Sequence, residues 1–151
     1  MEPTIVTKDE VVLVGVIADA SDICGLWGAF GAVEPRIPNT VQGTWYEVHT
    51  HPENYRQGEP WEVMVGVQVT GIDALPEGAT IKRLPAGQYA RFAHRLGNGG
   101  YSGLNPTMDN WLKTGPFRQL GSCCIQVIDS RFKGPDNPDS EIDFLIPVEP
   151  R

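Results

Sequence analysis

Short apolar runs alternate with polar segments along the chain, in patterns that indicate strands and helices in turn. Residues 10–19 (EVVLVGVIAD) are rich in Val and Ile, which predicts a strand buried on both faces or nearly so. A helix should follow, because apolar positions are then spaced by three and four residues, at Ile23, Leu26, Trp27 and Phe30. Two extended segments come next, at residues 44–50 (TWYEVHT) and 60–70 (PWEVMVGVQVT), separated by a polar loop.

The same order of elements recurs in the second half of the chain, after a short strand at residues 79–84. It predicts a strand at 88–95, a helix at 105–113 and two closing strands at 122–130 and 141–148. Two tandem strand-helix-strand-strand repeats predict an α+β domain with a pseudo-twofold antiparallel sheet. We expect both helices on one face, a ligand groove between the repeats, and a single domain over residues 1–151.

Composition narrows the classes of function. The chain has 151 residues, of which 40% are hydrophobic and 21% charged, as in an ordinary globular domain. Its 12 basic and 19 acidic residues give a formal charge of -7. Because phosphate binding requires a basic face and the sequence has no run of Lys or Arg, we expect no direct nucleic-acid binding.

The N-terminus and the cysteines indicate the compartment. The segment MEPTIVTKDEVVLVGVIADA lacks the basic start of a signal peptide, and no apolar stretch is long enough to cross a membrane. Three cysteines, two of them adjacent at Cys123 and Cys124, make a poor disulfide framework, and adjacent strand residues should face opposite ways. We therefore expect a cytoplasmic protein that does not associate with membranes.

Five ordered segments make the chain resemble a known family, the gyrase-inhibitor-like effector-binding domains. They are WEVMVGVQV, LPEGATIKRLPAGQYARFAHRLG, WLKTG, IQVIDSRF and SEIDFLIPV. Such domains are the ligand-sensing halves of many AraC- and MerR-type bacterial regulators. An LWGAF helix followed by IPN is most similar to the stand-alone integron-cassette branch, which has no DNA-binding domain of its own.

The resemblance implies a groove between the repeats that binds hydrophobic, often cationic, small molecules. In the family pattern, a Phe-Glu-x-Tyr segment precedes the last hairpin loop, and its Glu neutralises the bound cation. The matching residues here are Ile125-Gln126-Val127-Ile128, so both the carboxylate and the phenol hydroxyl are absent.

Gln126 and Glu47 are the two candidates for the polar centre of the groove. Gln126 shares a strand face with Ile128, and its neutral amide favours a neutral or weakly polar ligand, unless it only satisfies backbone groups. Superposing the repeats aligns Trp27 with Trp111 and Val65 with Ile146, and brings Glu47 near Gln126. Glu47 would then restore the lost charge from the other repeat. The alternative is a solvated residue on the helix-free face.

The remaining candidates for ligand contact are apolar or aromatic: Trp45, Trp61, Met64, Tyr89, Phe92, Trp111, Phe30 and Leu145. His49 and His51 alone do not complete a zinc site, and no phosphate-binding or dinucleotide motif is present, so we expect no metal and no cofactor. The glycine-rich residues 97–100 predict a mobile loop, which would gate an adjacent groove.

Three functions fit these observations. The first is a small-molecule binding module for hydrophobic or cationic ligands, acting as a homodimer or with a separate regulator. A second, from the resemblance, is a hydrolase of cyclopropane-bearing natural products, which would need Glu47 because the amide of Gln126 is no general base. The third is a protein-interaction module of the gyrase-inhibitor kind.

Overall fold

The computed structural model describes residues 2–151 and has the α+β architecture expected from the sequence. In the first half lie β1 (Thr4–Lys8), β2 (Val11–Asp19), α1 (Ile23–Val33), β3 (Trp45–Thr50), β4 (Glu62–Gln68) and β5 (Thr80–Leu84). In the second half lie β6 (Gly87–Arg95), α2 (Asn105–Thr114), β7 (Phe117–Gln119), β8 (Cys123–Ile128) and β9 (Glu141–Pro150). Single 3-10 turns at Ala20–Asp22 and Glu34–Arg36 flank α1.

The strands form an antiparallel sheet in the order β1-β6-β9-β8-β3-β4-β2-β5, with β7 paired to the end of β9. The first repeat is therefore β2-α1-β3-β4 and the second is β6-α2-β8-β9. They meet where β3 pairs with β8, and there Glu47 lies directly opposite Gln126. The two tandem repeats and their pseudo-twofold relation are confirmed.

Local sequence explains where the helices begin. The Asp22 carboxylate accepts a hydrogen bond of 2.8 Å from the backbone N–H of Gly25, which caps α1. Pro106 lies in the first turn of α2, where its missing N–H costs least. Both helices bury one stripe, through Leu26 and Phe30 in α1 and through Met108 and Trp111 in α2.

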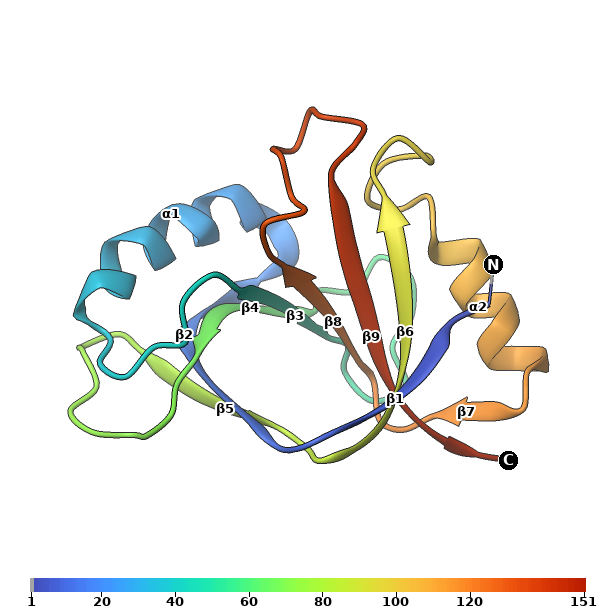
Figure 1. Cartoon of the computed structure of the whole chain (residues 1–151), viewed down its shortest axis with the longest axis horizontal. Helices are drawn as coiled ribbons and strands as arrows, with labels where there is room; N and C mark the ends of the chain where they lie inside the picture. Colours follow the sequence, from blue (N-terminus) through green and yellow to red (C-terminus); the bar gives the residue numbers. More distant parts are fainter. Residues whose placement is uncertain (1) are drawn as a thin grey trace.

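Three hydrophobic clusters hold the sheet. One lies under α1 and a second under α2, on the same face of the sheet. The third covers the helix-free face and consists of Val11, Leu13, Tyr46, Val48, Met64, Leu84, Tyr89, Ile125 and Leu145. It is buried although no helix covers it, because the sheet curls into a half-barrel. In Figure 1 the two helices lie at opposite sides, with β8 and β9 between them.

Two strands were not expected from the sequence. β1 extends the sheet beyond β6, and the three-residue β7 pairs with β9. Both are short and mix polar with apolar residues, so their pairing depends on the neighbouring strand more than on their own pattern. None of the described helices is both long enough and apolar enough to cross a membrane.

Candidate functional site

The centre of the site is the pair formed by Glu47 and Gln126 at the pseudo-twofold axis. Glu47 is opposite Val65 of the cluster under α1, and Gln126 is opposite Phe144 of the cluster under α2. Both side chains therefore face the helix side of the sheet, between the two helices. They are 8% and 9% exposed, so Glu47 is a buried residue of the helix face, not a solvated residue of the opposite face.

Glu47 takes part in a chain of short hydrogen bonds. Its Oε1 accepts from the indole Nε1 of Trp27 at 2.7 Å, and its Oε2 lies 2.6 Å from His49 Nε2. The indole Nε1 of Trp61 donates to His49 Nδ1 at 3.0 Å. Because Nδ1 accepts this hydrogen bond, the network assigns the ring proton to Nε2, which donates it to Glu47. His49 is then a neutral donor.

The negative charge of Glu47 therefore lacks a permanent cation. In the described chain, the only basic side chain within ion-pair distance of its carboxylate is His49. A buried carboxylate is costly unless a countercharge balances it, and two neutral donors do so only in part. The site therefore holds one buried carboxyl group whose hydrogen-bond partners are neutral donors.

Gln126 provides a neutral polar group beside this carboxylate. Its Nε2 is 3.4 Å from His49 Nε2, so two donors face each other at the limit of hydrogen bonding. Rotating the amide would instead offer its oxygen as an acceptor. Cys124 and Ile128 share this strand face, and burial, with the charges of Cys123 and Glu47, raises the pKa of the Cys124 thiol to about 12.

Three half-buried tryptophans surround the acid. Trp27 comes from α1, Trp45 from β3, and Trp61 immediately precedes β4. The indole of Trp45 donates to Glu34 Oε2 at 2.6 Å, which fixes its ring beside the end of α1. Trp45 and Trp61 were expected from the sequence. The bond from Trp27 to Glu47 was not, because a tryptophan on a helix stripe gives no signal beyond core packing.

Tyr101 in the glycine-rich loop is a further residue near the acid. Its side chain is exposed, and its pKa is raised first by partial burial and then by the charge of Glu47, which places the phenol within electrostatic reach of that carboxylate. His94 Nε2 contacts the Gly100 carbonyl at 2.7 Å and anchors the loop. The link between this loop and Glu47 is thus electrostatic, and the gating role of the loop stays a prediction.

The other sequence-predicted candidates lie elsewhere. Phe30 is in the core under α1, and Phe92 and Trp111 are in the core under α2. Met64, Tyr89 and Leu145 face the helix-free side of the sheet, so the sheet separates them from Glu47. The sequence interpretation placed them near the groove because apolar strand residues look alike in composition, although alternation sends neighbours to opposite faces.

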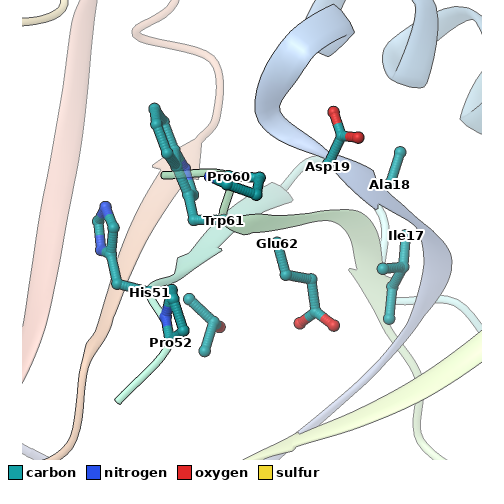
Figure 2. A pocket seen from close by; sticks show the side chains of 9 residues that line it. Ile17, Ala18, Asp19, His51, Pro52, Pro60, Trp61 and Glu62 are labelled. Atoms are coloured by element: carbon teal, nitrogen blue, oxygen red, sulfur yellow. The ribbon is translucent and has the colours of Figure 1, made fainter. Parts of the chain in front are cut away.

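An open cleft adjoins the site at the ends of β2, β3 and β4. It has a volume of about 510 Å³ and is lined by Ile17, Ala18, Asp19, Thr50, His51, Pro52, Pro60, Trp61 and Glu62. Figure 2 shows Trp61 and His51 on one side, Asp19 and Ile17 on the other, and Glu62 between them. Trp61 belongs both to this cleft and to the hydrogen-bond chain of Glu47.

Nothing in the described residues resembles a metal centre. No three His, Cys, Asp or Glu side chains from residues 2–151 converge closely enough to hold an ion. Side-chain chemistry at the site is therefore that of one buried acid, one histidine, one amide and several indoles.

Known structures with the same fold are found over nearly the whole chain. The C-terminal domain of EcmrR gives a TM-score of 0.77 at 15% identity and covers 99% of this chain and 98% of that one. SAV2435 bound to tetraphenylphosphonium gives 0.69 at 11% identity, covering 99% and 94%. An integron cassette protein of Vibrio cholerae gives 0.64 at 14% identity, covering 99% and 97%.

The chain spans only 58% of the full EcmrR chain in its complex with DNA, where the TM-score is 0.75 at 12% identity. At such identities these likenesses show the fold alone. Among curated proteins, no sequence is significantly similar to the chain. A model of one family, the integron-associated effector-binding proteins called Cass2, matches residues 4–148. With that match over almost its entire length, the chain belongs to the Cass2 family of integron-associated effector-binding proteins.

Proposed function

We propose that the protein binds small aromatic cations in the groove between its repeats, with Glu47 as the countercharge. The observation that carries this proposal is the buried Glu47 carboxylate, whose hydrogen-bond partners, Trp27 and His49, are both neutral. A cation that enters the groove would balance a charge that the protein itself leaves uncompensated.

The surrounding side chains suit the rest of such a ligand. Indole rings attract cations over their faces, by about 0.5 to 2 kcal/mol, and they also bury flat apolar groups. Gln126 adds a hydrogen-bonding group without charge, so it orients a ligand and leaves the selection of charge to Glu47.

The related proteins support this ligand class. SAV2435 was solved with bound tetraphenylphosphonium, a bulky aromatic cation, and has the same fold at 11% identity. EcmrR, which was solved in complex with DNA, carries this fold as its C-terminal domain. We extend the proposal to a ligand-sensing role in bacterial transcription regulation, exercised in the cytoplasm as a homodimer or through a separate regulator.

Tryptophan fluorescence tests the binding directly. Tetraphenylphosphonium should quench it saturably, whereas triphenylphosphine oxide, which is aromatic but uncharged, should bind at least tenfold more weakly. Equal affinity for both compounds would show that charge is not recognised. No response to either would reject the binding proposal.

One observation favours a second candidate function, a hydrolase. The carboxylate of Glu47 and the imidazole of His49 are 2.6 Å apart, a spacing compatible with a general base that activates water. Mass spectrometry of ligand recovered after incubation separates the two functions. Intact ligand supports binding, and time-dependent addition of water to a cyclopropane-bearing compound supports catalysis.

A further inference from the structure

A second cavity lies on the opposite, helix-free face of the sheet, at one end of the half-barrel. It has a volume of about 370 Å³, within the range of small-molecule pockets. Its walls come from β3, β5, β6, β8, β9, the β5–β6 connection and the turn before β8. They include Thr50, Lys82, Leu84, Tyr89, Cys123 and Ile125. In Figure 1 the β5–β6 connection runs along the lower rim of the curled sheet.

Strand alternation separates this cavity from the groove of Glu47. Thr50 pairs with Cys123 across β3 and β8, one residue beyond the pair formed by His49 and Cys124. The same two strands thus present Glu47 and His49 to the helix side and Thr50 to the other. The cavity is therefore a feature separate from the Glu47 face of the sheet.

A basic side chain, Lys82, lines the cavity and is weakly paired with Glu62. Lys82 is paired with Leu13 of the helix-free cluster, so its side chain faces the cavity. Its ammonium contacts only the half-exposed Glu62, with Oε2 at a long 3.6 Å, which is a weak ion pair. Arg83 points the other way and bonds Glu10 at 2.9 Å. None of the described residues that line the cavity is acidic, although the charge of the nearby Glu62 raises the pKa of the Cys123 thiol.

Two further side chains mark the cavity as a polar site. Among the described residues, the Oγ1 of Thr50 is the one buried side-chain oxygen or nitrogen without a regular hydrogen bond; its interaction is with the neighbouring Cys123 thiol, a weak partner that leaves the hydroxyl able to donate to a stronger acceptor. Burial raises the pKa of the Cys123 thiol; the positive charge of Lys82 and a hydrogen bond with Thr50 oppose that rise, and the negative charge of Glu62 adds to it.

We propose that this cavity binds a small apolar anion, namely an aryl or short-chain carboxylate. The apolar body would contact Leu84, Tyr89 and Ile125, while the carboxylate would accept hydrogen bonds from the ammonium of Lys82 and from the Thr50 hydroxyl. The cavity lies on the opposite face of the sheet from Glu47, and it shares Thr50 with the cleft beside Trp61.

Protection of Cys123 from alkylation measures occupancy. The assay uses a Cys24→Ser background, which removes the exposed thiol. Labelling with iodoacetamide at pH 8.5 is followed by mass spectrometry. Cys124 should stay unlabelled, because its raised pKa keeps it a thiol at this pH. Naphthalene-2-carboxylate should slow labelling of Cys123 at least fivefold and saturably, and naphthalene-2-methanol should protect at least tenfold less well at equal concentration. No protection, or equal protection by both, would overturn the proposal.

Two variants with opposite expected signs test the role of charge. Lys82→Met should weaken carboxylate protection about tenfold, whereas Lys113→Met, an exposed lysine on α2, should leave it unchanged. Glu62→Gln removes the ion-pair partner of the Lys82 ammonium and should therefore tighten binding of the carboxylate probe severalfold. Misfolding does not produce such a gain. If Lys82→Met and Lys113→Met behave alike, or Glu62→Gln weakens binding, Lys82 does not select the anion.

Discussion

The two repeats share a topology and differ in what their helical tryptophans contact. In the first repeat, the indole of Trp27 donates to Glu47 at the centre of the molecule, at 2.7 Å. In the second, Trp111 is stacked on Phe117 inside the core, and its indole lies 3.3 Å from Glu2 at the N-terminus. The helical tryptophan of the first repeat thus makes a hydrogen bond at the axis between the repeats. The helical tryptophan of the second repeat packs in the core under its own helix.

This difference distinguishes the two halves of a duplicated fold. The sheet pairing brings the two repeats together at Glu47 and Gln126, so the asymmetry is concentrated in one pair of neighbouring side chains. The family pattern has a Glu at the position of Gln126, on β8. In this chain the carboxylate is instead that of Glu47, on β3, the corresponding strand of the first repeat. Both positions lie on the same face of the sheet, where β3 and β8 pair.

The largest expected effect is on Glu47. Glu47→Gln keeps the shape but removes the countercharge, so affinity for tetraphenylphosphonium should fall by about 2 kcal/mol, or about thirtyfold. Isothermal titration calorimetry measures the change, and Glu77→Gln, at an exposed loop residue, is the control for net charge. Stability should not fall, because an uncompensated buried charge is removed. Unchanged affinity would place the cation elsewhere.

Gln126→Glu should act in the opposite direction and somewhat less strongly. A second carboxylate at the axis should raise affinity for the cation by about 1 kcal/mol or more, since a charged hydrogen bond exceeds a neutral one. In the absence of ligand, two acids that face each other should repel, and the melting temperature should drop. If cation affinity is the same as in the wild type, Gln126 does not line the groove.

The tryptophans of the two helices offer a matched pair of substitutions. Trp27→Phe removes one hydrogen-bond donor of the Glu47 carboxylate. The loss of this hydrogen bond should by itself lower the free energy of unfolding by about 1 to 3 kcal/mol. The corresponding loss in Trp111→Phe is smaller, because the 3.3 Å contact with Glu2 is long and peripheral. Urea denaturation compares them. Equal losses in both would remove the distinction between the repeats.

The smallest expected change is spectroscopic and concerns Tyr101. Because the charge of Glu47 contributes to the raised pKa of this phenol, Glu47→Gln should lower that pKa toward its ordinary value. Ultraviolet titration of the wild type and the variant, with Tyr101→Phe to identify the signal, measures the shift. An unchanged titration would separate the glycine-rich loop from the groove.

Sequence alone predicted the repeats, both helices and the strands of the central sheet, because their periodicities and turn residues are strong. The sequence alignment of the repeats matched Val65 with Ile146. In the structure Val65 is the partner of Glu47, and Phe144 is the partner of Gln126. When Glu47 and Gln126 are taken as corresponding positions, Val65 corresponds to Phe144. The equivalence is therefore two residues away from the predicted one. Since side chains alternate with a period of two, this error preserves the face, and Glu47 still reaches the axis as expected.

Side-chain partners were less predictable than strand positions. Nothing in the sequence distinguishes Trp27, which bonds Glu47, from a tryptophan that only packs. Met64, Tyr89 and Leu145 were grouped with the groove, although the curl of the sheet buries them on its opposite face. That curl arises from pairing among all the strands, including β1 and β7, and a local pattern does not encode it.

The central claim is that the groove recognises charge at the pseudo-twofold axis, and exchanging the two residues tests it most directly. The double variant Glu47→Gln, Gln126→Glu should be titrated with tetraphenylphosphonium beside Glu47→Gln alone. Because the two positions pair across β3 and β8, the exchange should recover at least half of the binding free energy that the single variant loses. A double variant that binds no better than Glu47→Gln would contradict the account.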